Sequence, residues 1–397
     1  MQHEASKPYR PHLFCAQGKV YATSQREIFL LERGQKQMIY QHTPPGRLAH
    51  AALTNDACYI SFQEPGQQQE MLAVSLQNGA LLWRTLLEGY LPDVPYVYGD
   101  HIYLCSSWSV TVLRREDGSL AWRRRLQAGW CEHPVIWNKT LYVTIQEHLS
   151  RESRRKHHRR EQPALVALRC EDGAELWRTS LPDNPQFFGA IIPVHDLLCL
   201  SLSHGCVAIH AQTGTILWQW IDKDGPYHHG FFTVENRVCY LGGRLTTWPM
   251  RYESPLPSDL ESFQNLPFGE RARLNLLIAG QQSHHLATVR ALRLPDGVCL
   301  WQQIFEYDRE CLLEGIVSGK RVFLLFLSWL RGTRSTDLLA VLSENGLPLW
   351  QKHVCDYLCG APLIVDDVLY FGADDGHVYA LRTDTGDLLW SIPITLS

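Results

Sequence analysis

Residues 360–390, GAPLIVDDVLYFGADDGHVYALRTDTGDLLW, form the most regular copy of a unit that recurs along the 397-residue chain. An apolar segment at 362–365 is followed by alternating apolar runs at 368–372, 378–381 and 388–390, with turn residues between them. Short alternating runs separated by turn residues are typical of β-strands joined by hairpins. The stretch is therefore expected to form four antiparallel strands.

A glycine followed four residues later by a tryptophan marks seven copies of the unit. The pairs are Gly79 and Trp83, Gly118 and Trp122, Gly173 and Trp177, Gly214 and Trp218, Gly297 and Trp301, Gly346 and Trp350, and Gly386 and Trp390. An eighth, degenerate copy begins the chain with Gly34 and Met38. Successive tryptophans lie 39, 55, 41, 83, 49 and 40 residues apart, which indicates a unit of about 40 residues with three enlarged copies.

Two further positions recur in register with the glycine. Six residues before it stand Ala73, Ala167, Ala208, Ala291, Ala340 and Ala380, with Ile28 and Val112 in the other two copies. A two-residue turn signal precedes each second strand, at Gly18-Lys19, Asn55-Asp56, Gly99-Asp100, Asn138-Lys139, His195-Asp196, Glu235-Asn236, Gly319-Lys320 and Asp366-Asp367. Such pairs suit tight hairpins, and most are followed within three residues by an aromatic side chain.

Eight units of four short strands predict an all-β fold, an eight-bladed β-propeller of four-stranded antiparallel blades in one domain. The blades are expected at roughly 11–41, 48–86, 94–126, 133–181, 189–221, 230–304, 314–353 and 360–394. Each tryptophan would lie on an outermost strand and fill the wedge between blades, and the small residue opposite would leave room for the ring. A linear solenoid is the alternative, which four antiparallel strands per unit disfavour.

The segments VYALRTDTGDLLW, VALRCEDGAELW, VAIHAQTGTILW and MLAVSLQNGALLW resemble the tryptophan-docking repeat of pyrroloquinoline-quinone (PQQ) type propellers. The resemblance covers nearly the whole chain, from about residue 11 to residue 394. That superfamily includes quinone-dependent alcohol dehydrogenases and the non-catalytic lipoprotein BamB. The resemblance implies the fold and not a function, because the repeated residues pack blades and carry no chemistry.

Composition limits the classes of function. The formal net charge of −4 gives no global reason to expect nucleic acid or an acidic membrane surface as a partner. No signal peptide and no apolar run long enough to span a membrane is visible, so a cytoplasmic protein is expected. Twelve scattered cysteines then indicate reduced, mostly buried thiols.

Extra residues fall at one position of the repeat, between the second and third strands. They occupy residues 63–70, 146–162, 244–285 and 328–336. Because strands alternate in direction, these loops are expected to emerge on one face of the ring together with the links between blades. Extra residues on one face of a repeat protein commonly mark the binding face.

Two of the insertions suggest partner binding. The run Arg151–Arg160 could dock nucleic acid or an acidic protein surface through Arg154, Arg155, Lys156, Arg159 and Arg160, although a solvated loop without a partner is the competing interpretation. The insertion 244–285 carries Trp248, Tyr252, Phe263 and Phe268 among prolines, which resembles a partner-binding arm. Alternatively it folds back over the central channel or a neighbouring blade.

No catalytic or metal-binding signature is visible. The sequence has no nucleophile elbow, zinc-protease motif or glycine-rich phosphate loop, and its Cys and His residues lack paired zinc-site spacing. A quinone dehydrogenase of the family would be expected to have adjacent cysteines, a calcium site and a longer chain, and no two cysteines are adjacent here. We therefore expect no catalytic residue, no metal site and no cofactor. This expectation extends to PQQ with calcium.

The leading hypothesis is a non-enzymatic, monomeric scaffold that binds a protein or peptide through the insertion-bearing face. The alternative is a quinone- or small-ligand-binding propeller that uses the central channel, although the first strands around 134–136, 191–193 and 362–364 are mainly apolar. A third possibility is a sensor or scaffold domain that works beside a signalling protein.

Overall fold

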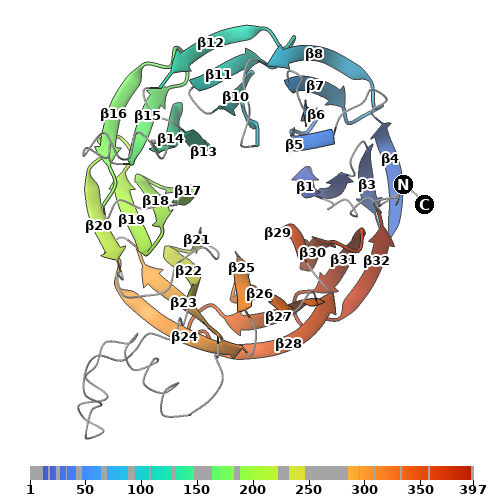
Figure 1. Cartoon of the computed structure of the whole chain (residues 1–397), viewed down its shortest axis with the longest axis vertical. Coiled ribbons are helices and arrows are strands. Elements are labelled where there is room, and N and C mark those ends of the chain that lie inside the picture. The colour runs from blue at the N-terminus through green and yellow to red at the C-terminus, as the bar shows by residue number, and fades with distance from the viewer. Residues whose placement is uncertain are drawn as a thin grey trace, which may run out of the picture.

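The structure is a computed structural model that describes residues 12–394 except 17, 24–26, 33, 42–46, 64–68, 88–93, 107–108, 127–129, 147–162, 183–187, 222–231, 246–284, 295, 308–309, 331–332 and 356–357. The described residues form eight separate four-stranded antiparallel sheets, and none of their elements is a helix that could cross a membrane. The sheets stand as blades around a central axis, with the first strand of each innermost and the fourth outermost (Figure 1). The predicted eight-bladed propeller is confirmed.

Each blade is one continuous piece of chain, and blades are numbered here in chain order. Blades 1 to 4 comprise β1 (His12–Ala16), β2 (Lys19–Thr23), β3 (Glu27–Glu32), β4 (Gln35–Gln41); β5 (Arg47–Leu53), β6 (Ala57–Gln63), β7 (Gln69–Ser75), β8 (Leu81–Leu87); β9 (Tyr96–Tyr98), β10 (His101–Cys105), β11 (Ser109–Arg114), β12 (Leu120–Arg125); and β13 (Trp130–Trp137), β14 (Thr140–Gln146), β15 (Ala164–Arg169), β16 (Glu175–Ser180). Blades 5 to 8 comprise β17 (Phe188–Val194), β18 (Leu197–Leu202), β19 (Gly205–His210), β20 (Ile216–Ile221); β21 (Phe232–Glu235), β22 (Val238–Leu245), β23 (His285–Arg293), β24 (Cys299–Tyr307); β25 (Glu310–Ser318), β26 (Arg321–Leu330), β27 (Thr333–Leu342), β28 (Pro348–Cys355); and β29 (Leu358–Val365), β30 (Val368–Ala373), β31 (His377–Arg382), β32 (Leu388–Pro393).

The hairpins between first and second strands follow the turn signals, with two corrections. Positive φ angles at Asn138 and Lys139 are those of a tight turn whose twist matches the strands it joins. In blade 6 the turn is Asn236-Arg237, because Glu235 pairs with Val238, so the predicted Glu235-Asn236 is one residue early. In blade 1 Lys19 already pairs with Ala16, so the predicted Gly18-Lys19 is one residue late.

Blade 1 also departs from the expected register of its outer hairpin. In the other seven blades the residue six positions before the glycine lies directly opposite the tryptophan, as Ala73 lies opposite Trp83. In blade 1 the residue opposite Met38 is Phe29. The prediction that Ile28 occupies this position is wrong, because Ile28 pairs with Tyr40. The cause is a shorter turn, since Glu32 pairs with Gln35 across two residues where the other blades use a longer loop.

Buried apolar side chains form eight clusters, each at the contact between two neighbouring blades, which we call a seam and name by the two blade numbers. Seam 8–1 is closed without exchange of a strand between the first and last blades, by apolar packing and by a hydrogen bond of 2.8 Å from Lys36 Nζ to the backbone oxygen of Pro393. There Val20, Ala22 and Phe29 pack against Val378 and Ile394. The stability of the ring therefore depends on how well each seam packs.

The insertions lie between second and third strands, but the strands extend into them. Gln146, Arg244, Leu245 and His285 belong to β14, β22 and β23, so the segments that separate the strands are 147–163 and 246–284. Residues 328–336 were predicted to be a loop insertion, which is wrong. Ser328 pairs with Ser335 and Leu330 with Thr333, so these residues lengthen the hairpin of β26 and β27. Every blade repeats the same strand order, so all eight connections of this kind leave from one face of the ring, which we call the insertion-bearing edge.

Candidate functional site

A recurring polar contact joins neighbouring blades at four of the eight seams, 2–3, 3–4, 4–5 and 6–7. In seam 4–5 the Tyr142 hydroxyl and the Trp177 Nε1–H both donate to the carbonyl oxygen of Ala211, over 3.1 and 3.0 Å. The same double contact joins Tyr103 and Trp122 to Cys170 in seam 3–4, and Tyr240 and Trp301 to Ser343 in seam 6–7. We call this arrangement, together with the glycine three residues after the acceptor, a docking site.

The glycine of each docking site makes room for the tryptophan ring. A Cβ atom on Gly214 would lie 2.7 Å from Cε3 of Trp177, closer than real Cβ contacts, and its φ of +72° is one that glycine adopts without strain. Equivalent contacts of 2.6–2.8 Å hold at Gly118, Gly173, Gly297, Gly346 and Gly386, each against the tryptophan of the preceding blade. The tryptophans at 83, 122, 177, 218, 301 and 350 therefore sit against the next blade, and Trp390 lies 3.6 Å from the corresponding point on Gly34.

Two seams lack the polar half of the docking site. The indole Nε1 atoms of Trp218 and Trp350 are buried without an acceptor among the described residues. In these blades the second-strand tyrosine is replaced by Cys199 and Phe323, which occupy its position opposite Ala208 and Ala340. A buried donor without a partner costs free energy. Other contacts join these blades, since the Arg290 guanidinium lies 4.7 Å from the ring centre of Trp220 in seam 5–6 and Lys352 pairs with Asp387 in seam 7–8.

Among the described residues, seam 1–2 contains no tryptophan. Met38 occupies its position and is 51% exposed, and a Cβ on Gly79 would lie 2.1 Å from the backbone oxygen of Ile39. The backbone of β4 thus takes the space that an indole ring fills in other seams. Phe14, Ile39 and Tyr40 complete the apolar cluster of this seam.

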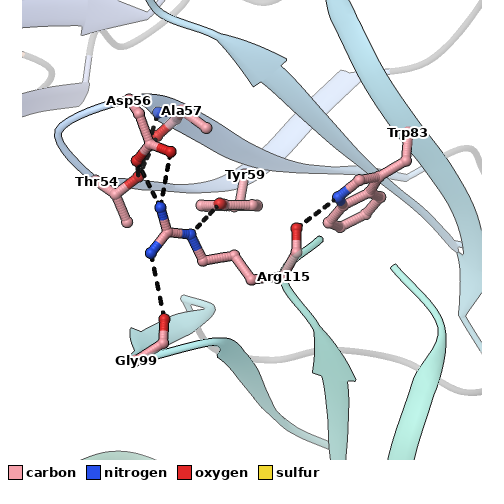
Figure 2. A network of polar contacts seen from close by, with 7 residues as sticks. All are labelled: Thr54, Asp56, Ala57, Tyr59, Trp83, Gly99 and Arg115. Atoms are coloured by element: carbon pink, nitrogen blue, oxygen red, sulfur yellow. Dashed lines mark hydrogen bonds and ion pairs between the residues drawn. The ribbon is translucent and has the colours of Figure 1, made fainter. Parts of the chain in front are cut away.

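Seam 2–3 adds an ion pair to its docking site. Trp83 Nε1 donates to the backbone oxygen of Arg115 over 2.8 Å, while the Arg115 guanidinium donates to Tyr59 and to both oxygens of Asp56, at 2.8, 2.6 and 2.7 Å. Figure 2 shows the guanidinium reaching also to Gly99 and the Asp56 carboxylate held by Thr54. The Thr54 hydroxyl, with Arg115, lowers the pKa of Asp56.

The sequence predicted that the tryptophans pack between blades. It did not reveal that the tyrosine hydroxyls and Arg115 also bond neighbouring blades. The recurring aromatic after each turn was a signal for the tyrosines, whereas Arg115 lies in a segment, RREDG, that reads as an ordinary solvated turn. The predicted partner-binding residues lie outside the described part of the chain. They are Arg154, Arg155, Lys156, Arg159, Arg160, Trp248, Tyr252, Phe263 and Phe268.

The insertion-bearing edge also carries short polar turns. In blade 8 the Tyr379 hydroxyl donates to Asp375 over 2.6 Å, and His377 Nδ1 lies 3.4 Å from the other carboxylate oxygen. In blade 3 the Ser106 hydroxyl lies 2.9 Å from that of Ser109. Within the described ranges, no group of three or more His, Cys, Asp or Glu side chains could hold a metal ion.

One carboxyl group on an innermost strand has a shifted pKa. Glu314 of β25 lies on the same side of its strand as Ile316, which packs against the cluster of seam 7–8, whereas Leu313 packs toward blade 6. Burial raises the pKa of Glu314 to about 7, and no other cause contributes. The ionised form is therefore disfavoured in the folded chain.

Replacing Glu314 with glutamine should stabilise the fold in a pH-dependent way. The folded chain binds this proton more tightly than the unfolded chain, whose pKa is near 4.5, so stability falls as pH rises from about 4.5 to about 7. Glu314→Gln should raise the free energy of unfolding by about 2 kcal/mol at pH 8 and change it little at pH 4.5. Urea unfolding at both pH values measures this, with the exposed Glu344→Gln as control. An equal effect at both pH values would contradict the assignment.

Comparison with known families decides the affiliation of the chain. Residues 109–243 and 286–394 match the family model described as outer membrane protein assembly factor BamB. The chain belongs to this family. The BamB-family match runs from β11 to the last blade and omits 244–285, the insertion of blade 6. It also leaves out blades 1 and 2, whose seam lacks a tryptophan.

Solved structures share the fold of this BamB-family chain at low sequence identity. BamB from Moraxella catarrhalis is 12% identical with a TM-score of 0.62, over 93% of this chain and 92% of that one. The computationally designed protein Ika8 is 10% identical with a TM-score of 0.62, over 96% and 98%. Quinohemoprotein alcohol dehydrogenase from Comamonas testosteroni is 12% identical with a TM-score of 0.50, over 98% and 68%. No curated protein matches in sequence.

Proposed function

We propose that the chain is a non-enzymatic scaffold that binds a protein or peptide partner through the insertion-bearing edge of the ring, without a cofactor. The observation that carries the proposal is the uneven distribution of extra residues. The connections between first and second strands are tight turns in the described blades, whereas residues 64–68, 147–163 and 246–284 and the lengthened β26–β27 hairpin all belong to the opposite edge. The family takes its name from an assembly factor, which agrees with a binding role.

The charges of the ring favour blades 3 and 4 as the contact for an acidic partner segment. Residues 94–181 contain 14 Lys or Arg and 10 Asp or Glu, although the whole chain has an acidic excess of four. Exposed arginines occur on the outer strands of these blades at 123, 125 and 178, of which Arg178 pairs with Glu175, and on that of blade 2 at 84, and the outer strands of blades 5 to 8 contain none. The run 151–160 adds its charges between the second and third strands of blade 4.

Removing residues 247–283 should abolish partner capture and leave the fold intact. Leu245 pairs with Leu286, so a short glycine-serine turn can replace the segment without disturbing the register of β22 and β23. The variant should melt within a few degrees of the intact chain, because β22 and β23 keep all their pairs, from Val238 with Arg293 to Leu245 with Leu286. Quantitative affinity purification from the native cell, with thermal unfolding measured in parallel, checks both statements.

Two further variants complete this experiment. Replacing 148–162 with a short turn tests the basic insertion, and Lys139→Gly, at a positive-φ turn position on the opposite edge, should leave capture unchanged. Unchanged capture by both deletion variants would overturn the proposal, as would loss of folding on removing 247–283. Saturable binding of PQQ in the presence of calcium would contradict the cofactor-free role.

A further inference from the structure

Two buried thiols touch across seam 3–4. The Cys131 Sγ–H donates to Cys105 Sγ over 3.1 Å, and the two residues are 1% and 2% exposed. Neither is part of a disulfide. Cys105 ends β10 in blade 3, and Cys131 lies in β13, the innermost strand of blade 4, so the contact joins two blades.

The two cysteines lie close to the point where the chain leaves β14 and enters the insertion 147–163. Cys131 pairs with Ile145, one residue before the end of β14, after which the chain enters 147–163. Cys105 precedes the Ser106–Ser109 turn on the same edge of the ring. Both cysteines belong to one apolar cluster with Val110, Val143 and Ile145. This cluster holds β10 and β13 in place.

We propose that Cys105 and Cys131 are a thiol–disulfide modification site, at which a covalent bond closes seam 3–4 under oxidising conditions. A disulfide requires the sulfur atoms to lie about 2.05 Å apart, so the observed contact is only about 1 Å too long. Neighbouring side-chain torsions can supply a movement of that size while the strands stay paired. The bond would fix the insertion-bearing end of the seam, whereas the docking site of Trp122 and the ion pair of Arg124 with Glu175 join the same two blades at the opposite end.

The reaction balances with an external disulfide as the oxidant. The thiolate of one cysteine attacks a sulfur of oxidised glutathione and releases one glutathione thiolate, forming a mixed disulfide. The second cysteine then attacks the protein-side sulfur and releases the other glutathione. The two protein thiols lose two electrons and two protons, and the oxidant becomes two glutathione molecules.

The other buried cysteines provide controls within the chain. Cys199, Cys206 and Cys239 lie in the cluster of seam 5–6, and burial raises the pKa of Cys199 to about 12. Cys58 is buried in seam 1–2, where burial also raises its pKa. Among the described residues Cys58 shares its cluster with no second cysteine, so it should stay a thiol while the pair in seam 3–4 becomes linked.

The test refolds the full chain from denaturant in a glutathione redox buffer, so that burial in the folded state does not limit access. Trapped thiols are then mapped by peptide mass spectrometry without reduction. We expect a peptide linked through Cys105 and Cys131, and a rise in Tm of about 3–5 °C that dithiothreitol reverses. Cys58→Ala should keep the link and the rise, whereas Cys105→Ala and Cys131→Ala should lose both.

Recovery of both cysteines as alkylated free thiols after oxidative refolding would overturn the proposal, even if the substituted chains failed to fold. Linkage chiefly among Cys199, Cys206 and Cys239 would overturn it as well. A link that lowers Tm would show that the bond strains the seam, which contradicts a stabilising modification.

Discussion

Trp83→Ala should lower the free energy of unfolding by about 3–5 kcal/mol, the usual cost of removing a large buried ring. Trp83 is 8% exposed, packs against Tyr59 at a centroid distance of 6.0 Å, and donates to the Arg115 backbone. Alanine would leave a cavity against Gly118 and a buried carbonyl oxygen without its donor. Chemical denaturation with tryptophan fluorescence and circular dichroism measures the loss.

The neighbouring residue supplies a matched control for this variant. Leu82 lies on the same strand and is 55% exposed, so Leu82→Ala should change the free energy of unfolding by about 0.5 kcal/mol or less. Trp83→Phe keeps a ring but removes the hydrogen bond, and should cost an intermediate amount. Equal effects of Trp83→Ala and Leu82→Ala would show that the docking site does not hold the seam.

Gly118→Ala should destabilise the ring by about 3 kcal/mol. The added Cβ would lie 2.6 Å from Cε3 of Trp83 and 2.8 Å from Oγ1 of Thr85, so the indole must move out of its seat. The φ of +72° adds strain for any residue with a Cβ. Denaturant midpoints of the variant and the parent chain give the difference.

Gly99→Ala separates the steric contact with the tryptophan ring from the backbone strain of a positive φ. Gly99 also has a positive φ, +56°, but a Cβ there would meet nothing within 4 Å. This variant should cost only the backbone strain, about 1 kcal/mol. If Gly118→Ala and Gly99→Ala cost the same, close approach of the tryptophan ring does not explain why the docking position is glycine.

The sequence determined the number of blades because each seam imposes the same local requirement. A ring on the fourth strand needs a small residue opposite, as Ala73 faces Trp83, and a glycine in the next blade. These residues stand at fixed local offsets within each copy. The register of blade 1 was predicted wrongly because its two-residue turn shifts the pairing by one residue. Blade 1 has Met38 in place of the tryptophan, so its sequence contains no marker of the shift.

The polar half of the docking site could not be read from the sequence. Its partners come from different blades, and the Tyr240 hydroxyl reaches a carbonyl 103 residues away. Arg115 bonds Asp56 across 59 residues, and local sequence gives no distance between them. The contact of Cys105 with Cys131 arises in the same way, from two strands that only the closed ring brings together.

The candidate binding face was located by position rather than by chemistry. Alternating strand direction predicted that the insertions share one edge, and the strand order agrees. The lengthened β26–β27 hairpin was not foreseen, because residues 322–327 are apolar without alternation and give no sign of where a strand ends. The residues predicted to bind a partner stay a prediction.

Hydrogen exchange of the chain alone and bound to its captured partner tests the binding face most directly. Slowed exchange should be confined to the edge that carries 147–163, 246–284 and the β26–β27 hairpin, and the opposite turns at 138–139, 236–237 and 366–367 should exchange as in the free chain. Protection of those opposite turns, with none at the insertions, would contradict a scaffold that binds through the insertion-bearing edge.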